Sequence, residues 1–419
     1  MVSPPTPDSR STLDGTPLRA NREFITIVVG QGISALGDAV NYTALPLLVL
    51  YLTGSGFLMG VVGVLGSLPD LAFGLFAGAL ADRWDRRRMM LYADLGRALL
   101  TALIPLSVVF GWPTLAVVLL VTAPIQALRV LFMAAYTGAV PNLVGRRQIG
   151  QATSVIEAIY SLGWILGPAI AGVLAATIGP SLTLAVDAAS FLISAAALGL
   201  VRRPLRAERT GEPAHILSEI REGIRFVLGH RLLRTAILFW GTLMIGDAAL
   251  IPTITYFITR DLGLGAEAVG LVVSGFGLGS FIGSVAAGFL LRRSIGLPLL
   301  AGNAVGALAL LGVAMQSSLP PMVALALVAG MAQAIVLVSY VTLRAQSTPD
   351  ELIGRVGSTG RTVTLGFQPL GFLAAGVLLD LVAGRPTLTA IAIFLLGASI
   401  VFAFSGTLRR ARPIGRSAA

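Results

Sequence analysis

The sequence lacks the side chains from which metal centres and covalent cross-links are built. It has no cysteine, and its only two histidines are His215 and His230. Without cysteine a chain has neither a disulfide framework nor a thiolate metal site. Both histidines lie in a polar stretch near the middle of the chain, and no nucleophile or phosphate-binding motif accompanies the acidic residues. We therefore expect no metal site, no cofactor and no enzyme activity.

Charge is also scarce. Only 12% of the residues are charged and 55% are hydrophobic, whereas soluble domains carry about 25% charged residues. The net charge of +10 comes from thirty arginines with no lysine, and these do not form one basic patch. Nucleic acid is therefore not an expected partner. The apolar residues come in runs of roughly twenty, the length that crosses a bilayer core, which predicts a multi-pass helical protein in a lipid bilayer.

Twelve apolar segments are long enough to cross the membrane. They predict an all-α fold of two six-helix bundles, over residues 24–201 and 235–407, joined by a linker at 202–234 and flanked by polar tails at 1–23 and 408–419. The first segment is too long for a secretory signal and is interpreted as a span. The predicted spans are 24–51, 57–80, 89–110, 113–138, 151–178, 181–201, 235–258, 266–291, 295–316, 320–343, 358–380 and 387–407.

The arginines predict the orientation of the chain, because short cytoplasmic loops hold the excess of positive charge. Alternate connections between the spans are rich in arginine, and the connections between them contain only Arg260 and Arg385. Both termini are then cytoplasmic. The arginine-rich connections are 83–88, 146–147, 202–234, 292–293, the segment around Arg355 and the tail from Arg409.

The two halves resemble each other at a constant distance along the chain. Gly37-Asp38-Ala39 recurs 209 residues later as Gly246-Asp247-Ala248, and Gly145-Arg146 recurs at the same offset as Gly354-Arg355. Repetition at a fixed offset indicates duplication. Two six-span halves with a substrate site between them are typical of secondary transporters.

The linker contains apolar residues at helical spacing, which predicts an amphipathic helix on the cytoplasmic membrane surface. A plain linker of matched length is the other interpretation. The residues with this spacing are Ile216, Leu217, Ile220, Ile224, Val227 and Leu228.

A charged loop between spans two and three resembles the signature G-x-x-x-D-R-x-G-R-R of the major facilitator superfamily. The resemblance implies a cytoplasmic gate that pins the two halves together while the transporter faces outward, and Asp94 with Arg97 are candidates to join it. Simple anchoring by positive charge explains the arginines but not the two aspartates. Asp85 replaces the usual glycine. We expect this extra carboxylate to weaken the ion pairs of the gate or to change their partners. The gate candidates in the loop are Gly78, Asp82, Arg83, Asp85, Arg86 and Arg87.

Span five contains a second motif, which resembles the G-x-x-x-G-P-x-x-G-G pattern of the antiporters of the superfamily. Small residues four apart allow close helix packing, and proline permits a kink. Span eight offers glycines at the same spacing, and the resemblance implies that spans five and eight meet. The motif residues are Gly163, Gly167, Pro168 and Gly172, and the span-eight residues are Gly275, Gly279 and Gly283.

A third motif of the superfamily, built around an arginine in span four, is only partly present, with Arg129 alone carried over. The loop motif together with Ala185–Leu198 is similar to the branch of bacterial exporters that handles macrolides and enterobactin. The resemblance as a whole covers residues 24–407.

Charged side chains in the middle of spans are costly and are functional candidates by default. Asp38 and Asp247 occupy corresponding places in spans one and seven, and Asp70 lies in span two. Proton coupling or substrate contact is the functional interpretation, with Arg129 as a partner, and a structural hydrogen bond is the alternative. Glu157 and Asp187 lie nearer to span ends, where a structural role is expected. Aromatic residues, more often packing than ligand contacts, are Tyr42, Tyr136, Trp164, Trp240, Tyr256 and Tyr340.

Together these features predict a monomeric bacterial inner-membrane transporter that exports an amphipathic small molecule against inward proton flow, with the proton gradient as its energy source. A proton-coupled importer, a lysolipid flippase and a non-transporting receptor on the same fold are the alternatives.

Overall fold

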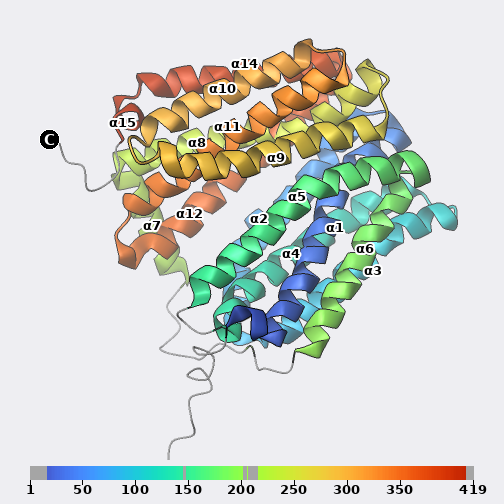
Figure 1. The fold of residues 1–419 in the computed structure, drawn as a ribbon, viewed down its shortest axis with the longest axis horizontal. Helices are drawn as coiled ribbons and strands as arrows, with labels where there is room; N and C mark the ends of the chain where they lie inside the picture. The colour runs from blue at the N-terminus through green and yellow to red at the C-terminus, as the bar shows by residue number, and fades with distance from the viewer. Residues whose placement is uncertain (1–16, 145–147, 202–204, 206–215, 412–419) are drawn as a thin grey trace, which may run out of the picture. The chain divides into compact units, whose positions relative to one another are not determined.

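The computed structural model describes residues 17–144, 148–201, 205 and 216–411. Within these ranges the backbone is helical and contains no strand (Figure 1). The helices of the N-terminal part are η1 (Leu18–Ala20), α1 (Arg22–Thr53), α2 (Gly56–Arg83), α3 (Arg86–Val109), α4 (Thr114–Leu143), α5 (Ile149–Ile178) and α6 (Pro180–Leu200). Those that follow are α7 (Ile216–Gly229), α8 (Arg231–Tyr256), η3 (Phe257–Asp261), α9 (Ala266–Leu290), α10 (Gly296–Met315), α11 (Leu319–Gln346), η4 (Asp350–Leu352), α12 (Ile353–Leu365), α13 (Gln368–Val382), α14 (Gly384–Phe404) and α15 (Gly406–Arg409).

The prediction of an all-helical chain with twelve spans is confirmed for the described residues, where twelve segments are long and apolar enough to cross a membrane. A helix satisfies its own backbone hydrogen bonds, which a segment in lipid requires. The eleventh span, Asp350–Val382, is divided into η4, α12 and α13. Pro369 stands in the first turn of α13; proline has no N–H to continue the preceding helix, so the break falls there.

The chain divides into two compact units that do not coincide with its linear halves. The first contains Met1–Tyr42, Ala72–Gly167 and Ser181–Thr210. The second contains Thr43–Leu71, Pro168–Pro180 and Gly211–Ala419. The second half of α1, the beginning of α2 and the end of α5 therefore pack with the C-terminal helices.

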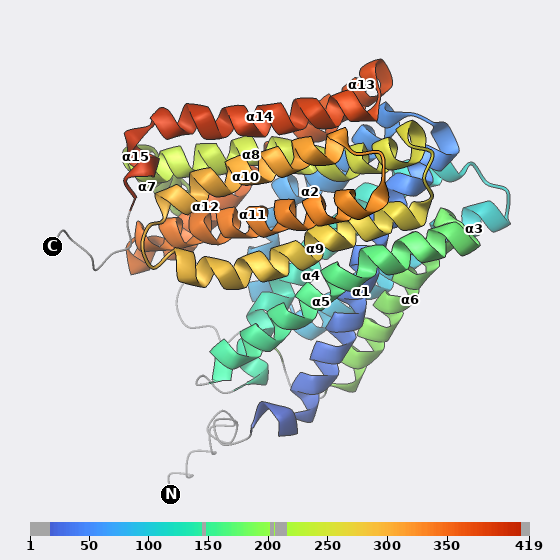
Figure 2. The same cartoon turned by 45° about the horizontal axis from the view of Figure 1, so that its top comes forward.

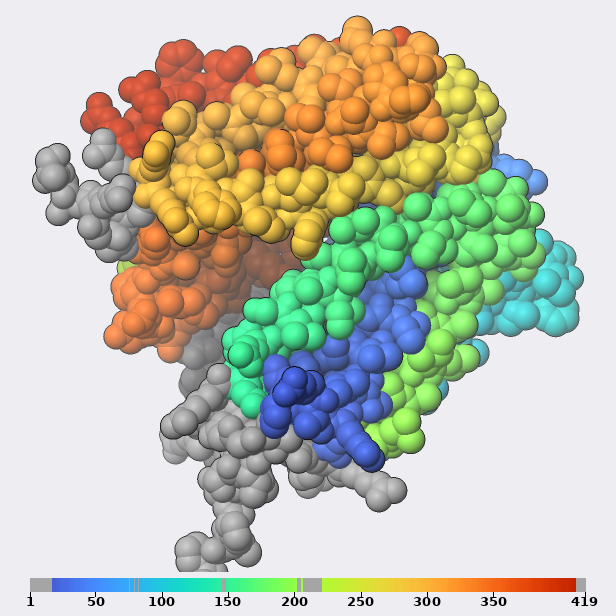
Figure 3. All heavy atoms as spheres, viewed as in Figure 1, coloured from blue at the N-terminus to red at the C-terminus, as the bar shows by residue number. Residues whose placement is uncertain are grey.

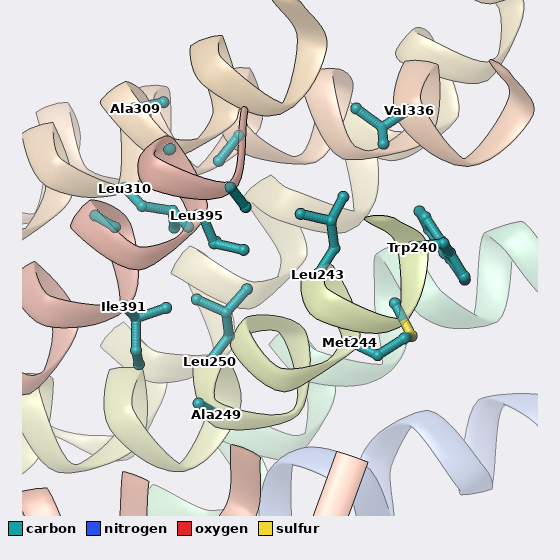
Figure 4. Packing of buried hydrophobic residues seen from close by; sticks show 14 of the residues in the cluster. Trp240, Leu243, Met244, Ala249, Leu250, Ala309, Leu310, Val336, Ile391 and Leu395 are labelled. Carbon is teal, nitrogen blue, oxygen red and sulfur yellow. The ribbon is translucent and has the colours of Figure 1, made fainter. Parts of the chain in front are cut away.

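In the second unit, helices α9, α11, α10 and α14 pack side by side in that order, and α8 packs against α14 and α13 (Figures 1 and 2). Side chains of α8 such as Leu243 and Leu250 lie beside Leu395 of α14 and Leu310 of α10 (Figure 4). Figure 3 shows the atoms of α9 and of the helices beside it in yellow to orange. The core of this unit also includes Leu47 of α1.

The glycine face of α9 corrects one expectation from the sequence. Gly275, Gly279 and Gly283 pack against α11 and not against α5, since a side chain on Gly279 or Gly283 would overlap backbone atoms of Leu327 or Met331. Backbones this close allow the dispersion contacts that drive helix association in lipid. The contact of α9 with α5 lies elsewhere, at Gly270.

The first unit has its own apolar core, in which α3 and α4 pack closely. Met90 of α3 and Phe132 of α4 are both buried there, together with Ile27 of α1 and Leu198 of α6.

Helix α7 lies in the part of the chain where the sequence predicts an amphipathic helix. Its Val227 is buried, whereas Ile224 and Leu228 are exposed, and Glu222 pairs with Arg355 at the start of α12 at 2.5 Å. The side chains of Ile216, Leu217 and Ile220 lie outside the described part of the chain. The helix packs on α12, where Gly223 faces Thr359, and its place on a membrane surface stays a prediction.

Candidate functional site

Asp38 in the middle of α1 forms an ion pair with Arg97 of α3. The carboxylate Oδ1 lies 2.5 Å from Nη2 of the guanidinium, and the two side chains are 28% and 3% exposed. Asp38 follows Gly37, where any side chain would overlap Ser190 and Asp187 of α6. Glycine at this place therefore lets α1 approach α6 and bring the carboxylate toward α3.

The guanidinium of Arg97 is enclosed on several sides. Its Nη1 lies 3.7 Å from the buried carboxylate of Asp94, one turn earlier on α3, and its carbon lies 3.8 Å from the centre of the Phe191 ring. Its Nε has no hydrogen-bond partner among the described residues. An arginine over an aromatic ring gains cation–π attraction when it is removed from water, so two carboxylates and a ring stabilise this buried charge.

Asp94 is the second carboxylate of the cluster and is fully buried. It accepts a hydrogen bond from the hydroxyl of Ser194 on α6 at 2.5 Å, and Ser194 accepts one from the amide of Gln31 on α1 at 2.6 Å. The sequence places Asp94 and Arg97 with the loop gate. The structure instead turns both side chains toward α1 and α6, which is a correction.

Asp187 of α6 is the third carboxylate, and sequence reasoning assigned it only a structural place near a span end. It is 1% exposed and accepts a hydrogen bond from Asn41 of α1 at 2.6 Å. Its second oxygen, Oδ1, has no hydrogen-bond partner among the described residues. The sequence offered one indication, because Asp187 is part of the stretch that resembles the exporter branch.

Two exposed aromatic rings continue the surface beside Asp38. Tyr42 lies one turn after Asp38 on α1 and contacts Trp164 of α5 edge to face, with ring centres 5.0 Å apart. The other aromatic candidates for which contacts are found serve as packing. Tyr136 is buried against Phe132, and Trp240 and Tyr340 are buried and stacked on each other.

The remaining intramembrane charges lie apart from this cluster. Asp247 of α8 accepts a hydrogen bond from Gln333 of α11 at 3.2 Å and lines a cavity. Asp70 of α2 lies 3.9 Å from the exposed guanidinium of Arg361 on α12. Arg129 of α4 is exposed, and no ion pair with any of the three candidate aspartates is found in the described chain. Arg97 therefore takes the role of partner that the sequence assigns to Arg129.

The loop motif binds the ends of helices within the first unit. Asp85 caps α3 by accepting a hydrogen bond from the amide of Arg88 at 3.0 Å. Arg86 donates to the carbonyl of Gly138 on α4 at 2.6 Å, and Arg87 to those of Leu198 and Gly199 on α6 at 2.9 and 2.6 Å. Cations near helix C-termini are favoured by the helix dipole, and Gly199 is one of the last four residues of α6, whose carbonyls have no partner within the helix.

The other members of the motif are less constrained. Arg83 is exposed, and a side chain on Gly78 would meet no atom within 4 Å. The side chain of Asp82 lies outside the described part of the structure. The cytoplasmic gate between the two halves stays a prediction, because the described hydrogen bonds of Arg86 and Arg87 join helices of the first unit only.

The glycines of the span-five motif let two different helices approach α5. Gly163 and Gly167 face α1, where Gly167 would overlap Ala39 if it carried a side chain. Pro168 lies inside α5, and Gly172 faces the backbone of Ala266 and Gly270 at the start of α9. The predicted meeting of spans five and eight therefore exists, but at the first turns of α9 and not at its glycine face.

A group that the sequence did not indicate fixes the turn between α1 and α2. Asp380, near the end of α13, accepts hydrogen bonds from the amides of Gly56 and Phe57 at 2.5 and 3.2 Å and from the Ser55 hydroxyl at 2.8 Å. A carboxylate at a helix N-terminus satisfies amides that have no helical partner. On the same turn, Arg260 of η3 donates to the carbonyl of Leu50 at 3.3 Å. Both residues tie the turn to the C-terminal helices inside the second unit.

Twelve apolar spans, a repeated Gly-Asp-Ala in the first span of each half and buried charges between the helices define a secondary transporter of the major facilitator type. The family model described as transmembrane secretion effector matches residues 13–412. The chain belongs to this major facilitator family.

Two curated relatives and one solved structure illustrate the similarity. The multidrug efflux pump Tap of Mycolicibacterium fortuitum is 30% identical over 92% of this chain and 96% of its own length. Macrolide efflux protein A of Streptococcus pyogenes is 28% identical over 53% of this chain and 55% of that protein. The crystal structure of a bacterial homologue of the human lysosomal transporter Spinster has a TM-score of 0.73 at 14% identity, covering 94% of this chain and 98% of that one. The last similarity shows the fold. Family and fold indicate a transporter and not an enzyme.

Proposed function

We propose that this protein exports an amphipathic small molecule in exchange for protons by alternating access. The observation that carries the proposal is the partly exposed Asp38 paired with the buried Arg97. A proton-coupling carboxyl must reach water in one state and have a partner that stabilises its ionised form. Asp38 meets both requirements in a single conformation.

The charges of the cluster support proton binding. Asp38 and Asp94 pair with the one guanidinium of Arg97, and Asp187 lies beside Gly37, the residue before Asp38, so these four side chains have a net charge of −2 when all three carboxyls are ionised. Charge without compensation in a low-dielectric interior costs several kcal/mol. A proton on one carboxyl reduces this cost. A proton on Asp38 also weakens its attraction to Arg97, which gives protonation a direct effect on the contact between α1 and α3.

The neighbouring aromatic pair supports an amphipathic substrate. Tyr42 and Trp164 are 42% and 37% exposed, although each is large and mostly apolar. Their faces offer stacking and apolar contact, and Asp38 one turn away offers a negative charge. This combination fits a lipophilic molecule that carries an amine or another cationic group. The multidrug and macrolide pumps among the relatives are consistent with a substrate of this kind.

Alternating access requires contacts that hold one side closed and can be broken. The bonds of Asp380 and Arg260 to the α1–α2 turn are suited to this role, because they are few, polar and near the surface. With both termini in the cytoplasm of a bacterial cell, this turn lies on the outer side of the inner membrane. We propose a monomer that uses the proton gradient and no cofactor, with lipid as its surroundings.

The test is the accumulation of a compound panel in an efflux-deficient bacterium that expresses the protein. The panel contains macrolides, tetracyclines, cationic dyes and siderophores, each measured with and without a protonophore. Lower accumulation that a protonophore restores supports proton-driven export and identifies the substrate class. Higher accumulation identifies an importer, and an unchanged level for every compound contradicts the exporter.

A further inference from the structure

A cavity inside the second unit has polar side chains from three helices and an otherwise mostly apolar wall. Asp247 of α8, Asn303 of α10 and Gln333 of α11 line it together with leucines such as Leu243 and Leu395. The free space admits about one water-sized particle. The cavity is therefore too small for a drug-sized molecule and suits a single small ion.

The carboxylate in this cavity has no cationic partner. Its Oδ1 accepts one hydrogen bond, from the amide of Gln333 at 3.2 Å, and no arginine forms an ion pair with Asp247 in the described chain. A carboxylate in such surroundings needs a compensating positive charge or a proton. One amide hydrogen bond does not supply that charge.

Asn303 contributes an oxygen whose orientation follows from its hydrogen bonds. The side chain is 4% exposed, and its nitrogen donates to the carbonyl of Leu395 and the hydroxyl of Ser399 on α14, both at 2.7 Å. Both donors of the amide are thus used on the α14 side, and the amide oxygen remains as an acceptor. Carboxylate and amide oxygens are ligands for hard cations.

The internal repeat relates the cavity beside Asp247 to the place of the Arg97 guanidinium in the first half. The offset of 209 residues that relates Asp38 to Asp247 also relates Asp94 to Asn303 and Arg97 to Gly306. Asp94 binds Ser194 on α6, and Asn303 binds Ser399 on α14, so each polar residue bonds a serine of the last span in its half. Gly306 lines the cavity. The space beside Asp247 is therefore the counterpart of the place that the Arg97 guanidinium fills in the first half.

From this correspondence we propose that the cavity binds one exchangeable monovalent cation, Na⁺ or hydronium, through Asp247, Asn303 and Gln333. The first half carries its cation covalently as an arginine, and the second half takes one from solution. The site is separate from the Asp38 cluster, and its occupancy does not depend on which molecule the protein exports.

The test measures the melting temperature of the purified protein in detergent. Na⁺ is raised at fixed pH and constant ionic strength by exchange against choline, and in a second arm the pH is varied in choline alone. A ligand that binds only the folded state raises the melting temperature in a saturable way. A saturable rise with Na⁺ identifies sodium. A rise toward low pH, present in the wild type and lost in Asp247→Asn, identifies hydronium.

Two glycine variants make the test specific. Gly288→Ala is the control, because Gly288 does not line the cavity and its added carbon would meet no atom within 4 Å; the response to the cation should remain. Gly306→Arg brings a guanidinium to the place that Arg97 has in the first half, and the response should disappear. If Gly306→Arg does not fold, Asp247→Asn carries the test alone. No response in either arm, or a response that persists in Asp247→Asn, would overturn the proposal. Because binding is measured without transport, its failure is distinct from failure of the proposed export.

Discussion

Arg97 of α3 is almost completely buried and lies 2.5 Å from Asp38 of α1, the one carboxylate of its cluster that water reaches. The residues are 59 positions apart in sequence, on two different helices. Protonation of Asp38 removes one of the two carboxylates that pair with Arg97. Any export that depends on protons should therefore depend on this pair.

Replacement of Asp38 by asparagine should abolish proton-driven export. Asparagine still accepts a hydrogen bond from Arg97 but neither binds nor releases a proton. Cells with Asp38→Asn should accumulate the substrate to the level of cells without the protein, and a protonophore should add nothing. Glu157→Gln on α5 is the matched control, because Glu157 is exposed and has no place in the cluster. Export by Asp38→Asn that still responds to the protonophore would contradict the assignment.

Removal of the guanidinium should destabilise the protein strongly. Arg97→Gln leaves buried carboxylates without their counter-charge, a change that costs about 3–5 kcal/mol for buried pairs. The melting temperature in detergent should fall, and Arg129→Gln, which removes an exposed arginine of α4, should change stability by less than about 0.5 kcal/mol.

The same pair should be coupled in a double-mutant cycle. Because Asp38→Asn removes a charge that Arg97 compensates, the double variant should be less destabilised than the sum of the single variants, by about 0.5–3 kcal/mol. Denaturation of the four proteins in one detergent checks this. Strictly additive effects would mean that the two residues do not interact energetically.

Loss of Asp380 should favour opening of the turn between α1 and α2. Asp380→Ala removes three hydrogen bonds to this turn, and loss of a helix cap costs about 1 kcal/mol. Since the chain has no cysteine, a single Leu47→Cys reports on the opening of the core in which Leu47 is buried. A maleimide should label it faster in Asp380→Ala. Asp380→Asn keeps an acceptor and should label at nearly the original rate. Equal rates in all three proteins would mean that the hydrogen bonds of Asp380 do not hold the turn closed.

The glycines of α9 should differ in their tolerance of a methyl group. Gly279→Ala places a carbon against the backbone of Leu327 and should lower the melting temperature, because backbone cannot move aside easily. Gly288 on the same helix has no atom within 4 Å of an added carbon. Gly288→Ala should be neutral or stabilising by up to about 1 kcal/mol through helix propensity. Similar melting temperatures for the two variants would contradict the close packing of α9 on α11.

The sequence by itself determined the number and type of the spans and the carboxylates to examine. Runs of about twenty apolar residues must be helices in lipid, because no water is present there to hydrogen-bond free backbone N–H and C=O groups. A charged residue such as Asp38 in one of these runs is costly in lipid and is therefore a functional candidate. The recurrence of Gly-Asp-Ala in the sequence also relates Asp38 to Asp247.

The tertiary structure alone decided which residues meet. A span that is apolar over most of its surface has no amphipathic face to show which way Arg97 or Asp187 turns. The sequence therefore assigned the partner of Asp38 to Arg129, where the structure has Arg97, and it placed Asp187 near a span end, whereas the structure buries it. The glycine face of α9 likewise fits any helix that approaches closely, and only packing assigns it to α11. Small residues and isolated charges specify that a contact exists, whereas its partner depends on which helices the fold brings together.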